Sequence, residues 1–289
     1  MKVLVLGGTG SIGGAVVDVL QQRGHQVFAL ARSPQSCEVL TKAGAVPVEG
    51  NLTDPSQWID NCDSVDGVIH AAATWDDQMG DIDRRTTEAV LDRLQSATSI
   101  KPFIYTGGCW LYGETGDTVA TEDSAFDPLD SFAYSIPTIQ LVLSASHSKG
   151  MVIHPAMVYE RDGGVFEHIF EDAEKLGYIR IVKGEHVRWP LIHRIDLAHV
   201  YALMLERGEQ GDVYNAATNH GVMIGDITRA IATRLGINTD PEICDTDKAM
   251  REIGSWTEGY AIDQQMSGDK ARTQLGWHPQ YEDVFAEIS

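Results

Sequence analysis

The chain has 289 residues and is 43% hydrophobic, which is enough for a globular core and excludes global disorder. Its formal net charge of −20, from 42 acidic and 22 basic residues, disfavours nucleic acid and anionic membranes as partners. No apolar run approaches the roughly 20 residues of a membrane-spanning helix, and the N-terminal KVLVL leads directly into glycines, which is unlike a signal peptide.

Short apolar runs recur along the first half of the chain and predict strands. They lie at residues 3–6, 27–31, 45–48, 67–70, 103–105 and 151–154. Their apolar residues are mostly unalternated, which is typical of strands buried on both faces of a parallel sheet. Helical spacing predicts helices between them over 11–23, 86–96 and 137–147. This alternation predicts right-handed βαβ units and an α/β fold with a doubly wound parallel sheet.

After residue 155 the pattern changes, because the connections lengthen and glycine and charged pairs become frequent. Predicted elements there are a helix over 195–207, a strand over 212–217, a helix over 224–235 and the segment DKARTQLGW at 269–277. We expect residues 1–154 and 194–218 to form the sheet domain. We expect residues 155–193 and 219–289 to form a smaller C-terminal lobe.

A glycine-rich loop joins the first predicted strand to the first predicted helix. In LVLGGTGSIGGAVV the spacing is GxxGxxG, which permits a tight turn and a close approach of the backbone to a pyrophosphate at the helix N-terminus. At this junction the motif predicts a Rossmann-type dinucleotide site, rather than a turn used only for packing. The predicted contacts are Gly7, Thr9, Gly10, Ser11, Ile12 and Gly13.

The end of the second predicted strand bears on the choice of nucleotide. An acidic residue there would bind a ribose 2′-hydroxyl, but the strand ends ALARS, with Ala31 at that position. Arg32 and Ser33 follow, and an arginine suits a 2′-phosphate, so the sequence favours NADP over NAD. The alternative is that Arg32 is a solvated loop residue.

These motifs together resemble the extended short-chain dehydrogenase/reductase family, which includes sugar-nucleotide epimerases and dehydratases. The resemblance runs through GGTGSIGG, GNLTD (50–54), VIHAAA (68–73), FIYTGGCWLYG (103–113), PAMVYERDGG (155–164), RWPLIHRIDLAHVYALMLE (188–206) and DKARTQLGWHPQY. It implies a six- or seven-stranded sheet, an active site at the carboxyl ends of the strands, and a C-terminal lobe that binds a small-molecule substrate. It also implies a homodimer in many members.

The resemblance assigns further residues to the two ligands. In GNLTD the family's first acidic position, which contacts adenine, is Asn51 here. Expected cofactor contacts beyond the glycine loop are Arg32, Ser33, Asn51, Leu52, His70, Ala71, Ala72, Pro155 and Met157. Expected substrate contacts are Cys109, Tyr159, Arg188 and His193. Arg188 suits an anionic group of the substrate, although a surface ion pair is an equal alternative.

The family's catalytic pattern of Ser or Thr with YxxxK is only partly present. Tyr134 matches the tyrosine, whereas Thr138 occupies the lysine position and Gly108 the serine position. Pro137 is tolerated only in the first helical turn, which places Tyr134 at or just before the helix start. Thr106 and Cys109 are the nearest replacements for the serine, with local hydrogen bonding and packing as their alternative roles.

An unassisted tyrosine titrates near ~10, so at pH 7 it is a poor base but is already protonated as an acid. We therefore expect an NADP(H)-dependent oxidoreductase or epimerase-like enzyme that acts on a small carbonyl or sugar-derived compound, with Tyr134 as a proton donor in reduction. The alternative is a dinucleotide-binding protein without turnover, such as a redox sensor or a partner-binding subunit, in which Tyr134 only packs against the cofactor.

Two further patterns in the sequence predict no additional functional site. The acidic stretch DDQMGDID (76–83) has no histidine or cysteine at ligand spacing, so we expect a solvated acidic loop and no metal site. The four cysteines at 37, 62, 109 and 244 form no CxxC motif and have no regular spacing. They predict reduced thiols and a cytoplasmic protein.

Overall fold

The computed structural model describes residues 1–252 and 254–289, and its main feature is a seven-stranded sheet. The strands are β1 (Lys2–Leu6), β2 (Gln26–Ala31), β3 (Val46–Glu49), β4 (Gly67–His70), β5 (Pro102–Thr106), β6 (Lys149–Pro155) and β11 (Val213–Ala216). Their order is β11-β6-β5-β4-β1-β2-β3, and each pairs with its neighbours in parallel. This is the predicted doubly wound Rossmann-type α/β fold. The order reverses between β1 and β4, and ligands of such sheets bind at the carboxyl ends of the strands at that point.

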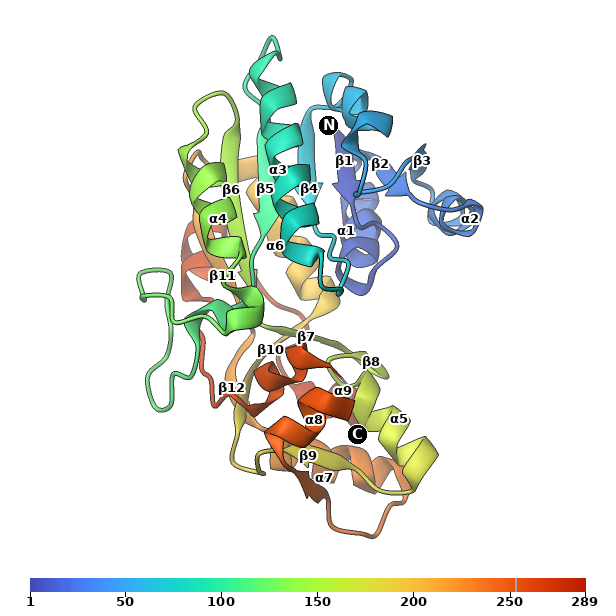
Figure 1. The fold of residues 1–289 in the computed structure, drawn as a ribbon, viewed down its shortest axis with the longest axis vertical. Coiled ribbons are helices and arrows are strands. Elements are labelled where there is room, and N and C mark those ends of the chain that lie inside the picture. The colour runs from blue at the N-terminus through green and yellow to red at the C-terminus, as the bar shows by residue number, and fades with distance from the viewer. Residues whose placement is uncertain (253) are drawn as a thin grey trace.

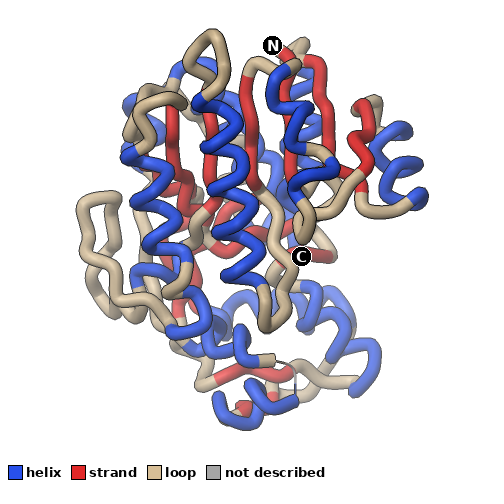
Figure 2. The backbone as a smooth tube through the Cα atoms, turned by 45° about the horizontal axis from the view of Figure 1, so that its top comes forward, coloured by secondary structure: helices blue, strands red, loops and turns tan. Residues whose placement is uncertain are grey.

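Helices cover both faces of this sheet (Figures 1 and 2). On one face lie α1 (Ser11–Gln22), α2 (Pro34–Lys42) and α6 (Arg194–Arg207), and on the other lie α3 (Met79–Gln95) and α4 (Ser135–Ser144). In β1, Val3 and Val5 face the first core, whereas Leu4 and Leu6 face the second. Because side chains alternate across a strand, burial on both faces requires the continuous apolar runs seen in the sequence.

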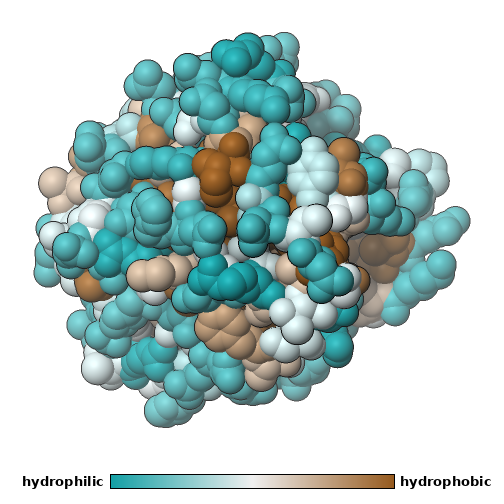
Figure 3. Space-filling view, turned by 90° about the horizontal axis from the view of Figure 1, so that it is seen from below, coloured by the Kyte–Doolittle hydropathy of each residue, from teal (hydrophilic) through white to brown (hydrophobic). Residues whose placement is uncertain are grey.

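The C-terminal lobe lies at the carboxyl ends of the large sheet (Figure 1). A four-stranded sheet joins β12 (Asn219–Met223), β10 (Arg188–His193), β7 (Met157–Glu160) and β8 (Gly163–Gly164), and a two-stranded sheet pairs β13 (Glu242–Cys244) with β9 (Arg180–Val182). Its helices are α5 (Glu167–Leu176), α7 (Ile224–Leu235), α8 (Thr246–Glu252) and α9 (Val284–Ile288). Seen from below, this end of the molecule is mostly hydrophilic with small separate apolar patches (Figure 3).

Two elements differ from their predicted bounds in ways that affect the site. Helix α3 begins at Met79 rather than at residue 86, so the second half of DDQMGDID is helical and the prediction of an acidic loop is wrong there. Helix α4 begins at Ser135, and Tyr134 is its N-cap residue, as Pro137 requires. Within the described residues, no helix is both long and apolar enough to cross a bilayer.

Candidate active site

The glycine loop connects β1 to α1 next to the end of β4. Gly7 has a φ of 93°, and a Cβ atom there would lie 2.7 Å from the carbonyl oxygen of Ala71. A Cβ atom on Gly13 would collide with the carbonyl oxygen of Gly7. Both positions therefore exclude side chains, because the loop passes directly over neighbouring backbone.

The N-terminus of α1 is open to an anion. Gly10 is the N-cap residue and supplies no side-chain cap, and the first helical hydrogen bond of the loop runs from the Gly14 amide to the Gly10 carbonyl at 2.8 Å. The amides of the first turn and the helix dipole are thus free to bind a pyrophosphate. Thr9, Gly10 and Ser11 are exposed at this turn, and Ile12 is half-buried. These residues fit the phosphates of a dinucleotide.

The residues after β2 lie at the same edge of the sheet. Arg32 is exposed and has no ion-pair partner among the described residues, whereas Ala31 is buried. Ser33 caps α2 by accepting a hydrogen bond from the Ser36 amide at 3.1 Å. Asn51 is exposed and accepts a hydrogen bond from the Thr53 amide at 3.1 Å. An unpaired arginine next to a helix N-terminus fits a 2′-phosphate.

Tyr134 lines a small cavity between α3 and α4. The cavity has a volume of about 10 Å³, close to the room that one water needs. Its other described lining residues are Leu52, His70, Ala72, Ala73, Thr74, Met79, Ile82, Asp83 and Thr86, and none of them is a lysine or arginine. Burial, together with the nearby Asp83 carboxylate, raises the pKa of Tyr134 well above its ordinary value. The phenol is therefore protonated at neutral pH.

Asp83 joins two further polar side chains at this cavity. The Tyr105 hydroxyl donates to Asp83 Oδ2 at 2.7 Å, and His70 Nε2 lies 3.3 Å from Asp83 Oδ1. The Asp83 side chain is only 11% exposed, so the prediction of a solvated acidic residue is wrong at this position. Asp83 and Tyr105 are the residues that sequence reasoning missed. The signal was the i, i+4 spacing of Ile82, Thr86 and Val90, which extends the buried face of the helix back to Asp83.

Thr138, at the family's lysine position, lies one turn after Tyr134 and is 1% exposed. Its hydroxyl has no hydrogen-bond partner in the part of the chain that the structure describes. The site thus has a buried neutral residue where the YxxxK pattern places a cation. A tyrosine without that cation gains no help in ionising.

Thr106 and Cys109 follow β5. The Thr106 hydroxyl donates to the His70 carbonyl oxygen at 2.6 Å and lies 2.6 Å from the Tyr201 hydroxyl. This hydroxyl is therefore already engaged with β4 and α6. Cys109 is buried, and burial raises the pKa of its thiol to about 12, so the sulfur is neutral. Catalytic or substrate-binding roles for these two residues stay predictions.

Tyr159 and His193 lie where β7 and β10 enter the C-terminal lobe. Tyr159 is fully buried, and its hydroxyl donates to the Tyr281 carbonyl oxygen at 3.4 Å. His193 stacks on Tyr281 at 3.7 Å between ring centroids and caps α6 by accepting from the Ile195 amide. Burial and Arg194 lower the pKa of His193 to about 4, so it is neutral at pH 7. Both side chains thus have clear packing partners, and their contact with substrate stays a prediction.

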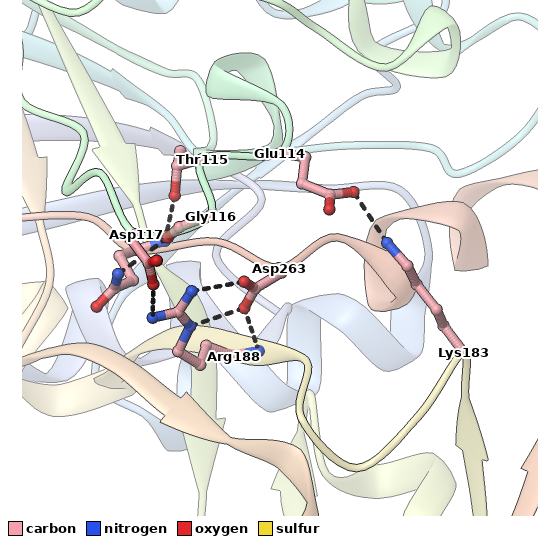
Figure 4. Close-up of polar contacts among 8 residues, drawn as sticks. Glu114, Thr115, Gly116, Asp117, Lys183, Arg188 and Asp263 are labelled. Carbon is pink, nitrogen blue, oxygen red and sulfur yellow. Dashed lines mark hydrogen bonds and ion pairs between the residues drawn. The ribbon is translucent and has the colours of Figure 1, made fainter.

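Arg188 is held by two carboxylates (Figure 4). Its Nε and Nη2 donate to the two oxygens of Asp263 at 2.8 and 2.6 Å, and Nη1 donates to Asp117 at 3.1 Å. Arg188 therefore forms ion pairs in this structure, which was the alternative to binding an anionic group of the substrate. Its guanidinium is occupied, so anion binding would require these contacts to break.

The remaining predicted cofactor residues lie at the sheet edge. His70 ends β4 with its ring buried, and its Nδ1 accepts from the Ala72 amide at 3.4 Å. The carbonyl of Ala71 faces Gly7 across the point where the strand order reverses. Pro155 ends β6 and Met157 begins β7, and both are buried where the two sheets meet. The structure brings the glycine loop and the end of β4 together, whereas Arg188 belongs to the lobe.

A family model identifies the family of this chain. The family model described as the NAD dependent epimerase/dehydratase family matches residues 3–217. An uncharacterised protein of Saccharomyces cerevisiae is 32% identical over 306 residues, covering 100% of this chain and 99% of the relative.

Two solved structures show the same fold at low identity. A dTDP-glucose 4,6-dehydratase from Bacillus anthracis in complex with NAD has a TM-score of 0.82 at 17% identity, covering 100% of this chain and 95% of the other. The human epimerase family protein SDR39U1 with NADPH has a TM-score of 0.79 at 19% identity, covering 99% and 97%. Both structures thus share the fold of this chain over nearly its whole length.

Proposed function

We propose that this chain, which belongs to the NAD dependent epimerase/dehydratase family, reduces a small carbonyl compound with NADPH. Family membership makes it one of a family of nicotinamide-dependent enzymes with oxidoreductase or epimerase roles. The observation that supports reduction is that the surroundings of Tyr134 keep its phenol protonated. This tyrosine is half-buried beside the Asp83 carboxylate, with no cation among the described residues that line its cavity.

Tyr134 acts as the proton donor in this proposal. When bound, the reduced nicotinamide supplies the hydride. Tyr134 gives its phenolic proton to the carbonyl oxygen as that oxygen gains negative charge, and the product is the alcohol. The resulting phenolate lies beside Asp83, which is an unfavourable pairing of like charges, so it recovers a proton from water. Because Tyr134 begins a helix and is packed against Gly80 of α3, its ring is held in place.

The reverse reaction, oxidation, requires Tyr134 in its ionised form. Oxidation of an alcohol, and epimerisation through a ketone, both need Tyr134 to accept a proton as phenolate. Even at an ordinary pKa near ~10, only about one tyrosine in a thousand is phenolate at pH 7. Burial and Asp83 reduce that fraction further. The same geometry thus favours an acid over a base.

NADP(H) is the proposed form of the nucleotide. The second strand ends with a buried alanine instead of an acid, and the exposed Arg32 follows it at the start of α2. An acidic residue at Ala31 would bind the 2′-hydroxyl of NAD and repel a 2′-phosphate. The exposed arginine offers the opposite charge.

A second candidate function is dinucleotide binding without turnover. Thr138 provides no cation to hold the tyrosine and ribose, and the Thr106 hydroxyl is engaged by His70 and Tyr201. These features favour a sensor or a partner-binding subunit in which Tyr134 only packs. The two candidates share the nucleotide site and differ in whether NADPH is consumed.

The experiment begins with calorimetric titrations of NADPH and NADH. NADPH is then mixed with a panel of aldehydes and ketones, and its absorbance at 340 nm is followed for wild type and Tyr134→Phe. We expect wild type to oxidise NADPH and Tyr134→Phe to lose about 10²-fold or more in rate while binding NADPH equally well. NADPH binding without any oxidation would support the second candidate, and no binding would contradict both.

A further inference from the structure

Five aromatic side chains contact one another in a ring where the sheet domain meets the C-terminal lobe. Ring centroids are 6.4 Å apart for Trp75 and Phe132, 4.9 Å for Phe132 and Trp110, and 6.1 Å for Trp110 and Tyr260. The circuit closes through Tyr260 to Trp256 at 5.4 Å and Trp256 to Trp75 at 6.1 Å. We call these five residues the aromatic cluster. Trp75, Phe132 and Trp110 come from the sheet domain, and Trp256 and Tyr260 from residues 255–261 of the lobe.

The aromatic cluster adjoins the cavity of Tyr134. Phe132 precedes Tyr134 by two positions, in the short 3-10 turn Asp130–Phe132 before α4, and Trp75 follows Thr74, which lines that cavity. A compound whose carbonyl reaches Tyr134 would therefore have its body next to these rings. The cluster is part of the site's surroundings rather than of either hydrophobic core alone.

Trp75 is the exposed member of the cluster. Its side chain is 59% exposed, and its backbone has a φ of 55°, a conformation that bulky residues rarely adopt. Such an outlier is maintained only when the surroundings enforce it, and it is found preferentially at ligand sites. Because the backbone fixes the position of Trp75 and its side chain faces solvent, the indole offers a flat apolar surface to a ligand.

Trp110 provides a polar group next to these rings. Its indole Nε1 is buried and has no acceptor among the residues that the structure describes. Its ring lies flush against Gly259, where a Cβ atom would collide with it, so the indole is fixed in place. A buried donor without a partner is costly, and an oxygen atom of a ligand would relieve that cost.

Two cations of this lobe, Arg188 and Lys183, are already paired with carboxylates (Figure 4). Arg188 precedes Trp189, whose ring lies 5.1 Å from Tyr260, and its guanidinium is held by Asp263 and Asp117. Lys183 donates to Glu114 at 2.9 Å. A diphosphate needs several free cationic or N–H donors, and it would also approach a chain of net charge −20. The charge distribution thus disfavours a nucleoside diphosphate sugar.

We propose that the substrate is an uncharged carbonyl compound with an aromatic body, bound against the aromatic cluster, rather than a nucleoside diphosphate sugar. The proposal rests on the proposed reductase function. Trp75 stacks on the body of the compound, and the indole N–H of Trp110 donates to an oxygen of it. Tyr134 protonates the carbonyl as hydride is delivered, so one ketone and one NADPH give one alcohol and one NADP⁺ after uptake of a proton.

The test measures binding without turnover. Protein saturated with NADP⁺ cannot reduce a ketone, so calorimetry gives the Kd of 2-acetonaphthone and of UDP-glucose directly. We expect 2-acetonaphthone to bind and UDP-glucose to bind at least tenfold more weakly. Equal or tighter binding of UDP-glucose, or no binding of 2-acetonaphthone at millimolar concentration, would overturn the proposal. Failure of NADPH oxidation with intact ketone binding would instead contradict the reductase function alone.

Variants of the exposed tryptophan locate the ligand. Trp75→Ala is expected to weaken 2-acetonaphthone binding by about tenfold, and Trp75→Phe to restore it to within about threefold, because a smaller aromatic ring still stacks. Trp110→Phe keeps the ring but removes the N–H, and a loss of about fivefold is expected. Ile100→Ala is the matched control, since Ile100 is 68% exposed elsewhere, after α3. Unchanged affinity in Trp75→Ala would place the ligand away from the cluster and refute the proposal.

Discussion

Thr138→Lys is the substitution that most directly restores the missing charge of the site. Thr138 is one helical turn after Tyr134, and side chains at this spacing lie about 5–6 Å apart. Two charges at that distance interact by about 3 kcal/mol at an effective dielectric constant of 20. Since one pKa unit corresponds to about 1.4 kcal/mol, the pKa of Tyr134 should fall by about two units. Asp83 provides a carboxylate near the new ammonium, which offsets part of the cost of burying it.

The assay is a titration of Tyr134 itself. The chain has nine tyrosines, so ¹³Cζ-tyrosine NMR is assigned by comparison with Tyr134→Phe, and the titration is repeated in Thr138→Lys. Thr138→Met is the matched control, because it adds a long neutral side chain at the same buried position. NADP⁺-dependent oxidation of an alcohol should also rise at neutral pH, by about 10²-fold for two pKa units. An unchanged pKa of Tyr134 in a folded Thr138→Lys protein would refute the reasoning.

Three further predictions concern the nucleotide and the pH dependence of stability. Arg32→Ala should weaken NADPH binding by about 10- to 100-fold and leave NADH binding nearly unchanged, and equal losses for both would contradict a 2′-phosphate contact. Gly13→Ala should abolish measurable dinucleotide binding, whereas Gly14→Ala, whose Cβ would meet only ordinary contacts at 3.7 Å, should retain it. Burial lowers the pKa of His154 to about 4, so between that value and about 6.5 the unfolded chain binds the extra proton and stability falls as pH falls. Urea unfolding at pH 7 and pH 5 should differ by about 2 kcal/mol from this residue, and His154→Phe should lose that part of the difference.

The sheet and the glycine loop could be predicted because their signals are local. Each central strand is buried on both faces and is therefore a continuous apolar run, and each turn of the loop needs glycine for a steric reason. The start of α4 was also predictable, since Pro137 is compatible only with the first turn. These features depend on residues close together in the sequence.

The polar contacts of the site depend on distant residues and were not predictable in the same way. Asp83 pairs with Tyr105 between a helix and a strand 22 positions later, and Arg188 pairs with Asp263 75 positions later. An acidic run has the composition of a solvated surface, and only the helical spacing of Ile82 and Thr86 indicates that one of its carboxylates faces inward. The aromatic cluster likewise combines four separate segments of the chain.

The most direct test of the central claim is the single-turnover oxidation of NADPH at pH 7 with an uncharged aromatic ketone. Wild type and Tyr134→Phe are each saturated with NADPH and mixed with excess 2-acetonaphthone, and the absorbance at 340 nm is followed. The proposed mechanism predicts oxidation by wild type and a rate at least about 10²-fold lower for Tyr134→Phe. Equal rates in the two proteins, or no oxidation by wild type that binds both ligands, would contradict Tyr134 as the proton donor of a reductase.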